Sequence, residues 1–436
     1  MVETTNLPLP PLVPAPALIE VVDEPPFVLN DEVVIVGEPS PTADYVVDLL
    51  SEAAGTPLPL LSEGASPLQR QIRLTVAPGA ALPAGPEAYR ISVEESLISV
   101  LARTEMGLAR AAATLLQLVT EGEEPAVPAA LVADAPRYAW RGLSLDVARS
   151  FFTVEEVKAV LDLLAEYKLN TLHLHLTDDQ GWRLEMPELP ELTQVSGATA
   201  AAGAQAGFFT VEDFADLQRY ARARGITVVP EFDVPGHTNA ATHALPSLNP
   251  TGEPTPVYTG DRVGFSKLYP ELEATGPFIS AVVDSLADQS ESEFLHFGGD
   301  EVFEMEPEDY STVVRMVSER IRERGRRPIG WQEAATADLP EDVIFQFWHP
   351  NASREAVIAA TQRGADLLLS PAEHVYLDMK YDADTPHGQD WAGHVELEDS
   401  YQWDPDTHLE GVPAHRVLGV EAAMWTERIQ DFQALT

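Results

Sequence analysis

Two adjacent carboxylates, Asp300 and Glu301, follow a short apolar segment and two glycines. The segment 294–297 predicts a buried strand, and the glycines let the backbone bend sharply behind it. Because close, partly desolvated carboxyls resist being ionised together, we expect their pKa values to separate. One then stays protonated while the other stays charged. Cleavage of a glycosidic bond needs this division, since the leaving oxygen takes a proton and the developing cation needs a negative partner.

The same pair has a plainer interpretation, because acidic residues are common at the solvated start of a helix. Four more acidic residues follow closely, at positions 304, 306, 308 and 309. Taken alone, the motif therefore leaves a catalytic and a merely solvated carboxyl pair both open, and the elements around it have to decide.

The composition limits both the fold and the partners. A chain of 436 residues with 45% apolar residues predicts one large domain and a smaller one. Its net charge of −43, from 70 acidic and 27 basic residues, argues against nucleic acid and anionic membranes as partners. The chain has no cysteine, which excludes disulfides and cysteine-ligated metals.

The amino terminus gives no targeting signal. Residues 1–16 are rich in proline and predict an extended, flexible tail. This segment lacks the basic start and apolar core of a signal peptide, and no apolar run reaches the length of a membrane span. We therefore expect a cytoplasmic protein, or a secreted one if a leader has been removed.

Residues 17–135 predict a small, non-catalytic α+β domain. Strands are expected at 33–36, 72–76 and 89–93, and helices at 43–54 and 105–119. The segment 121–136 contains three prolines and predicts the boundary to the next domain.

Residues 136–436 predict an α/β fold, a (β/α)8 TIM barrel that forms the catalytic domain. Helical patterns at 154–166, 211–223, 310–324 and 352–363 separate its expected strands. These strands are 142–147, 171–176, 226–231, 294–297, 328–331, 343–348, 366–369 and 417–424. Few residues follow the last strand, so the eighth helix is expected to be truncated. Either the chain is a fragment, or another segment or subunit, as in a homo-oligomer, covers that flank.

Barrel sites form at the carboxyl ends of the strands, and the residues expected there share a chemistry. They are Arg149, Asp178, Asp179, Asp233, His237, Asp300, Glu301, Trp331, Trp348, His349, Tyr376, Asp378, Trp391, Trp425 and Glu427. Flat aromatic walls combined with carboxylates and one arginine suit a sugar ring, whose C–H faces stack while its hydroxyls bind charged groups. The alternative, that the tryptophans only fill the core, accounts for one or two of the four.

Several spaced motifs resemble family 20 glycoside hydrolases, the β-N-acetylhexosaminidases. They are RGLSLDVAR at 141–149, HLHLTDDQGW at 173–182, PGHT at 235–238, HFGGDE at 296–301, YLDMKY at 376–381 and WTE at 425–427. The resemblance extends over about residues 17–430 and includes the small amino-terminal domain typical of these enzymes. It implies exo-hydrolysis of terminal β-linked N-acetylglucosamine or N-acetylgalactosamine, in chitin or glycan degradation.

The resemblance also implies roles. In this family the acetamido group of the substrate is the nucleophile, and an oxazolinium ion forms. Asp300 would orient that group, Tyr376 would hold its carbonyl oxygen, and Glu301 would be the acid and then the base. Asp178 and His237 would tune Glu301. Substrate binding would fall to Arg149, Trp331, Trp348, Asp378, Trp391, Trp425 and Glu427. No metal or cofactor is implied.

Two other interpretations stay open at this stage. His173 and His175 alternate on one expected strand, which is a spacing used by zinc-dependent barrel hydrolases, with His237 and Asp300 as further ligands. The other alternative is a sugar-binding barrel that has lost its activity. Such a protein would be expected to carry a substitution at Asp300, Glu301 or Tyr376, whereas all three are present.

Overall fold

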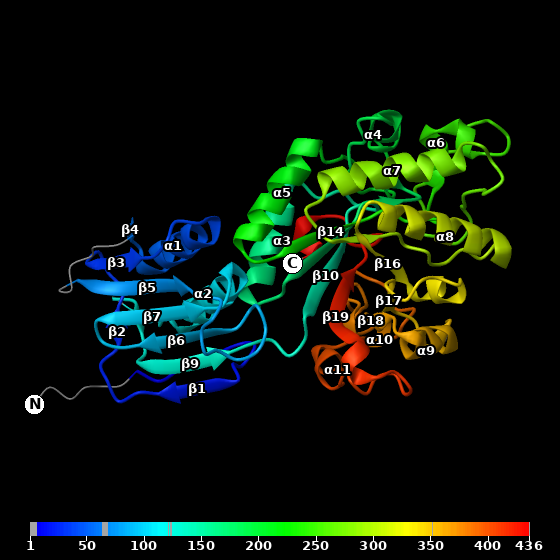
Figure 1. Cartoon of the computed structure of the whole chain (residues 1–436). Coiled ribbons are helices and arrows are strands. Elements are labelled where there is room, and N and C mark those ends of the chain that lie inside the picture. The colour runs from blue at the N-terminus through cyan, green and yellow to red at the C-terminus, as the bar shows by residue number, and fades with distance from the viewer. Residues whose placement is uncertain (1–6, 63–68, 121, 123, 351, 436) are drawn as a thin grey trace, which may run out of the picture. The chain divides into compact units, whose positions relative to one another are not determined.

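The computed structural model describes residues 7–62, 69–120, 122, 124–350 and 352–435. The chain forms two compact units (Figure 1). The first lies within residues 1–137, 159–170 and 219–226, and the second within the remaining residues. The chain passes from one to the other after residue 137, close to the boundary predicted at 135–136. Among the described residues, no helix is both long and apolar enough to cross a membrane.

A seven-stranded sheet with the order β1-β9-β6-β7-β5-β3-β4 organises the first unit. Its strands are β1 (Leu18–Val21), β3 (Val33–Val36), β4 (Leu60–Leu61), β5 (Arg70–Val76), β6 (Tyr89–Val93), β7 (Leu97–Ala102) and β9 (Ala130–Asp134). The half from β1 to β7 is antiparallel and the half from β7 to β4 is parallel. A separate pair joins β2 (Phe27–Val28) to β8 (Ala126–Val127). Helices α1 (Pro41–Ala54) and α2 (Glu105–Leu118) share the buried core with the sheet.

The structure departs from the sequence prediction in two places in this unit. Strand β9 lies inside the segment 121–136 that was expected to be a boundary, because its prolines precede and follow the strand rather than interrupt it. The tail predicted at 1–16 is partly anchored. Leu9 and Leu12 pack against the core, and Val13 exchanges two hydrogen bonds with the side chain of Gln117. Residues 1–6 lie outside the described part of the chain.

The second unit is a closed barrel of eight parallel strands, which confirms the predicted fold class (Figure 1). In order around the barrel, these strands are β10 (Trp140–Asp146), β11 (Thr171–His175), β14 (Thr227–Glu231), β15 (Phe294–His296), β16 (Arg327–Trp331), β17 (Ile344–Phe347), β18 (Asp366–Leu369) and β19 (Val417–Met424). Strands β10 and β19 pair in parallel and close the ring.

The helices around the barrel are less regular than the strands. They are α3 (Val154–Glu166), α5 (Val211–Ala223), α7 (Thr275–Gln289), α8 (Pro307–Glu323) and α9 (Arg354–Arg363). Between β16 and β17 there is only a short 3-10 helix, η2 (Gln332–Thr336), a departure from strict alternation that the sequence did not reveal. After β19 the described residues form one short helix, α12 (Phe432–Leu435). Short segments between the main elements are β12 (Thr177–Asp178), β13 (Gly181–Trp182), α4 (Glu191–Ser196), α6 (Asn239–Ala244), η1 (Pro246–Leu248), α10 (Ala372–Val375), α11 (Leu397–Tyr401) and η3 (Ala414–Arg416).

Two of the barrel helices begin with the same reciprocal capping interaction. Before α3, the Thr153 hydroxyl accepts from the backbone N–H of Glu156, and the Glu156 carboxylate accepts from the backbone N–H of Thr153. Thr210 and Asp213 make the same reciprocal pair before α5. Each pair satisfies two backbone donors that a helix start leaves unpaired, so the sequence itself fixes where these helices begin.

The turn after β15 is set by a close backbone approach. Gly298 and Gly299 have φ values of +67° and +102°, and a methyl group on Gly298 would lie 1.7 Å from Oδ1 of Asp233. That same oxygen accepts a hydrogen bond from the backbone N–H of Gly299 at 3.0 Å. Glu301 also has a positive φ of 49°, which is rare outside glycine and is found at functional sites. The two glycines therefore hold the turn that presents Asp300 and Glu301.

A pair of alanine substitutions separates the clash from the backbone preference. Gly325 has a φ of +71° but nothing within 4 Å of an added methyl group. We expect Gly325→Ala to cost about 1–2 kcal/mol through its left-handed backbone, and Gly298→Ala about 1–3 kcal/mol more through steric overlap. Thermal unfolding of both variants would check this, and equal melting temperatures would contradict it.

Candidate active site

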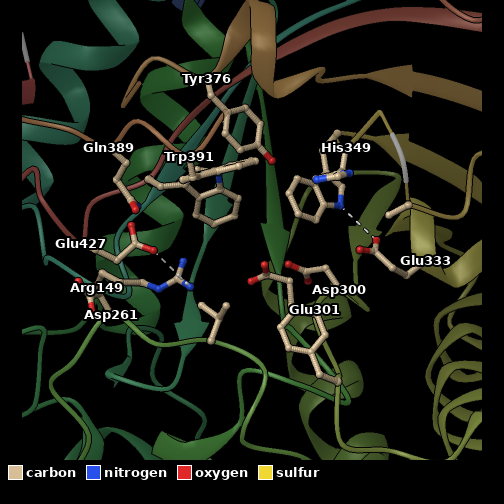
Figure 2. A pocket seen from close by; sticks show the side chains of 15 residues that line it. Arg149, Asp261, Asp300, Glu301, Glu333, His349, Tyr376, Gln389, Trp391 and Glu427 are labelled. Carbon is tan, nitrogen blue, oxygen red and sulfur yellow. Dashed lines mark hydrogen bonds and ion pairs between the residues drawn. The ribbon is translucent and has the colours of Figure 1, made fainter. Parts of the chain in front are cut away.

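A cavity of about 470 Å³ opens at the carboxyl ends of the barrel strands (Figure 2). Eight of the twelve residues assigned to the site from the sequence line it, and they come from both halves of the barrel. These eight are Arg149, Asp300, Glu301, Trp348, Tyr376, Trp391, Trp425 and Glu427. The other four, Asp178, His237, Trp331 and Asp378, lie behind or beneath the lining.

His237 lies between the two carboxylates and Asp178. Its Nε2 is 3.6 Å from Asp300 Oδ2 and 3.7 Å from Glu301 Oε2, and its Nδ1 is 3.2 Å from Asp178 Oδ1. Like Glu301, His237 has a positive φ, here 53°. The loops after β14 and β15 thus place His237 beside both Asp300 and Glu301.

The buried charges around His237 determine the protonation state of Glu301. Burial raises the pKa of Glu301 to about 7, although the positive charge of His237 opposes this rise. Burial also disfavours the charged form of His237, but the carboxylates of Asp178 and Asp300 outweigh it and raise the pKa of His237 well above its usual value. Glu301 therefore carries its proton up to neutral pH, as a general acid requires.

Arg149 connects the acidic residues on the other side of the pocket. Its guanidinium lies 2.7 Å from Asp178 Oδ2, 3.3 Å from Asp146 Oδ2 and 3.8 Å from Glu427 Oε1. It also lies over the ring of Trp425, 5.2 Å from the centroid. Burial would raise the pKa of Asp178, but Arg149 and the neighbouring histidines hold that pKa far below its usual value.

Aromatic rings form one wall of the pocket (Figure 2). Trp348 and Tyr376 are nearly parallel, at 9° with centroids 6.4 Å apart. Trp391 stands across both of them, at 77° to Trp348 and 82° to Tyr376. Its side chain is 47% exposed, so it lies at the rim, whereas Tyr376 is buried. Flat rings at different angles suit a saccharide and its small apolar substituents.

The structure places Trp331 and Asp378 below the surface of the pocket instead of on it. Trp331 is 1% exposed, packs 5.9 Å from Trp425 and donates its Nε1–H to Glu231 Oε1 at 3.0 Å. It supports Trp425 from below. Burial and the charge of Glu427 raise the pKa of Asp378 well above its usual value.

Several buried oxygens near the pocket have no hydrogen-bond partner within the described ranges. Among them are Asp300 Oδ1 and Glu427 Oε2, on residues that line the pocket. A buried acceptor without a donor costs free energy, so native structures rarely leave one unless a ligand or water satisfies it. These two atoms are therefore suited to accept from N–H and O–H groups of a bound sugar.

Within the described part of the chain, four groups of buried histidine and acidic side chains are close enough together to hold a metal ion. They are His173, Glu231 and His296; His175, Glu231 and Asp233; Asp178, Asp179 and His237; and Asp233, His237 and Asp300. His173 and His175, the ligands of the metal-hydrolase alternative, each contact a carboxylate through both ring nitrogens. A metal would have to displace these pairs.

The sequence matches two models of one family. Residues 138–319 and 306–436 match the catalytic domain of glycosyl hydrolase family 20, and residues 9–135 match domain 2 of the same family. The chain belongs to glycosyl hydrolase family 20. The resemblance drawn from the motifs is thereby confirmed, and the chain is a glycoside hydrolase.

Similar proteins and similar solved structures are β-N-acetylhexosaminidases. A β-N-acetylhexosaminidase of Cellulomonas fimi is 47% identical over 432 residues, which cover 98% of this chain and 86% of that protein. The GH20 β-N-acetylhexosaminidase from Streptomyces coelicolor A3(2) has a TM-score of 0.92 at 39% identity, covering 99% of this chain and 89% of that one. The Streptomyces plicatus N-acetyl-β-hexosaminidase in complex with Thio-NAglucal also has a TM-score of 0.92, at 38% identity and with 99% and 88% coverage.

Glu333 is the main residue of this glycoside hydrolase site that sequence reasoning missed. It lies in η2, lines the pocket and accepts a hydrogen bond from Trp348 Nε1 at 3.2 Å (Figure 2). Burial and the charge of Asp300 raise its pKa to about 8. Its position two residues after Trp331, at the end of a predicted strand, was the available signal. His349, Gln389 and Asp261 also line the pocket, and of these only His349 was expected there.

The raised pKa of Glu333 predicts a pH dependence of stability. Because the folded value of about 8 exceeds the ordinary value of 4.5, the folded protein binds more protons in this window and loses stability as pH rises. Glu333→Gln removes this loss, so its stability relative to wild type should rise by on the order of 2–4 kcal/mol from pH 5 to pH 8.5.

Thermal unfolding of wild type and Glu333→Gln at the two pH values measures the difference. Glu271→Gln, which changes an exposed carboxyl, is the matched control and should show no such trend. A Glu333→Gln effect that is the same at pH 5 and pH 8.5 would show that Glu333 titrates normally.

Proposed function

We propose that this chain hydrolyses terminal, non-reducing β-linked N-acetylglucosamine or N-acetylgalactosamine with retention of configuration, by substrate-assisted catalysis. The observation that carries the proposal is the pair Asp300 and Glu301 in the wall of an aromatic pocket, where burial raises the pKa of Glu301 to about 7. Family 20 is a named exception to the scheme in which a second enzyme carboxylate attacks the sugar. The nucleophile is then the acetamido group of the substrate itself.

The first step breaks the glycosidic bond. The acetamido carbonyl oxygen forms a bond to the anomeric carbon while the leaving oxygen takes the proton of Glu301, and an oxazolinium ion results. Asp300 accepts a hydrogen bond from the acetamido N–H and compensates its positive charge. The Tyr376 hydroxyl donates to the acetamido carbonyl oxygen and aligns it for attack. Holding the nucleophile close to the anomeric carbon replaces a bimolecular encounter with an intramolecular one.

The second step returns the enzyme to its starting state. Glu301, now a carboxylate, takes a proton from water as the water oxygen attacks the anomeric carbon and the oxazolinium ring opens. Two displacements at the same carbon give net retention. His237, within 4 Å of both carboxylates, compensates the charge that moves onto Glu301 between the steps.

Hydroxyl recognition falls to the other side of the pocket. Arg149 is a fixed donor, and Glu427 provides a buried acceptor oxygen. The rings of Trp348 and Trp425 offer flat faces to the acetamido methyl group and the sugar ring. A cavity of about 470 Å³ is of the size that takes a small ligand, which supports action on a chain end.

Replacing the acid gives the sharpest test. We expect Glu301→Gln to lower kcat about 10²–10⁴-fold on an aryl N-acetyl-β-glucosaminide with a poor leaving group, because general acid catalysis contributes that much. With a leaving group that needs no proton, such as dinitrophenolate, the loss should be far smaller. The wild-type rate should fall as pH rises through about 7, where Glu301 loses its proton.

Glu304→Gln is the matched control for that variant. Glu304 lies three residues away, but its side chain is 65% exposed, so its rate should stay at the wild-type level. If Glu301→Gln and Glu304→Gln hydrolyse the poor substrate at the same rate, Glu301 is not the acid.

Participation of the acetamido group can be tested with an inhibitor. A thiazoline derived from N-acetylglucosamine mimics the oxazolinium ion, so it should bind much more tightly than the product sugar. Asp300→Asn should weaken this inhibition, because the carboxylate that compensates the ring charge is lost. Inhibition constants for both proteins give the measurement, and no inhibition of the wild type would count against neighbouring-group participation.

A further inference from the structure

Below the pocket, buried ionisable side chains form a continuous row through the barrel lumen. Glu421 Oε1 is 2.9 Å from His173 Nδ1, and His173 Nε2 is 3.2 Å from Glu231 Oε2. The same Glu231 oxygen contacts His175 Nδ1, and His175 Nε2 is 2.9 Å from Asp178 Oδ2. Asp178 then reaches His237, which faces Glu301. We call the row from Glu421 to Asp178 the lumen row.

The strand register explains why these side chains meet. His173 and His175 are two residues apart on β11 and so point to the same face, here the lumen. Glu231 is the register partner of His175 on the neighbouring strand β14. The side chains of Glu421, His173, Glu231, His175 and Asp178 are all 1% exposed or less. Water therefore does not screen their charges, and they interact strongly with one another.

Glu231 is the branch point of the lumen row. Its Oε2 contacts His173 and His175, and its Oε1 lies 2.9 Å from His296 Nδ1 and 3.0 Å from Trp331 Nε1. Contacts with four side chains fix both carboxylate oxygens in place. The position of the His175 ring therefore depends on Glu231 on one side and on Asp178 on the other.

The charges along the lumen row alternate. Burial opposes ionisation of Glu231, yet His175, His296 and His173 hold its pKa well below the usual value. The pKa of His175 is raised well above its usual value because Glu231, Asp178 and Asp146 outweigh burial. The remaining neighbours of His175 include the ring of Trp425, 5.1 Å away, and Asp233 lies near Glu231. From Glu231 through His175 to Asp178, a carboxylate thus alternates with an imidazolium.

We propose that Glu231 is a positioning residue for the catalytic acid, holding His175 so that His175 orients Asp178 and His237 against Glu301. The inference rests on the proposed function, since it assigns Glu231 a part in the same reaction. Glu231 does not line the pocket, and it reaches Glu301 through His175, Asp178 and His237. Nothing in the reaction scheme above requires it.

Glu231→Gln tests the proposal, because glutamine keeps the shape but removes the charge that holds His175 as an imidazolium. We expect kcat to fall about 10–100-fold, the scale of a small misplacement of catalytic groups, with KM changed less than about threefold. The neutral His175 no longer adds positive charge beside Asp178, so the basic limb of the pH–rate profile should move to higher pH.

Glu421→Gln is the matched control. Glu421 is equally buried and also contacts His173, but His173 and Glu231 separate it from His175. Its kcat should stay within about threefold of wild type and its basic limb should not move. If Glu231→Gln and Glu421→Gln share the same kcat and the same pH profile, Glu231 is only structural and the proposal fails.

Two further measurements cover other outcomes. If Glu231→Gln does not fold, His175→Gln breaks the same link from the other side and should show the same kcat loss. In a His237→Asn background Glu231→Gln should change kcat less than about threefold, because its route to Glu301 is already cut. If the double variant loses kcat by the product of the two single-variant losses, the proposed route is wrong.

A readout without substrate separates this inference from the proposed function. The ring-nitrogen NMR signals of His237 in ¹⁵N-histidine-labelled protein should move in Glu231→Gln and stay unchanged in Glu421→Gln. Unmoved His237 signals in Glu231→Gln would overturn the inference even in an active enzyme. An inactive wild type with moved signals would refute the proposed function alone.

Discussion

The contact between Asp178 and its three cationic neighbours is the interaction on which the site depends. Arg149, His175 and His237 all lie within 3.2 Å of its two oxygens, and the carboxylate is fully buried. A buried charge of this kind is tolerated only when it is paired and hydrogen-bonded on all sides. Asp178 therefore fixes three residues at once: Arg149 beside the pocket, His237 against Asp300 and Glu301, and His175 towards the lumen. Removing one partner would leave an uncompensated charge for the others.

The site is built on strained backbone. Glu301 and His237 both have positive φ values, and Gly298, two residues before Asp300, has no room for a side chain because Asp233 approaches it. Such conformations persist only where surrounding contacts impose them. Here hydrogen bonds to the backbone of Gly299, from Tyr310 to its carbonyl and from its N–H to Asp233, hold the turn from both sides. The acid is thus oriented before any substrate arrives.

Most of the barrel could be predicted because parallel strands buried on both faces are continuous apolar runs, and helix starts such as Thr153 and Thr210 carry local signals. The residues of the mouth could be predicted because they directly follow those strands. Other features had no local signal. Strand β9 was hidden among prolines, and η2 replaced an expected helix. Trp331 lies beneath the pocket, whereas Glu333 lies on its wall. The sequence did not show this, because the direction of a side chain at the end of a strand depends on the turn that follows.

The lower part of the lumen has a consequence for proton movement. Below the charged row, Trp140, Val229, Ile329, Ile344 and Leu368 form a buried apolar cluster with Phe294 and Leu418 packed against it. The side chains of this cluster carry no ionisable group, so none of them can take up or release a proton. Inside the lumen, the histidines therefore have proton-exchange partners within the row and towards the pocket, and none in the apolar cluster.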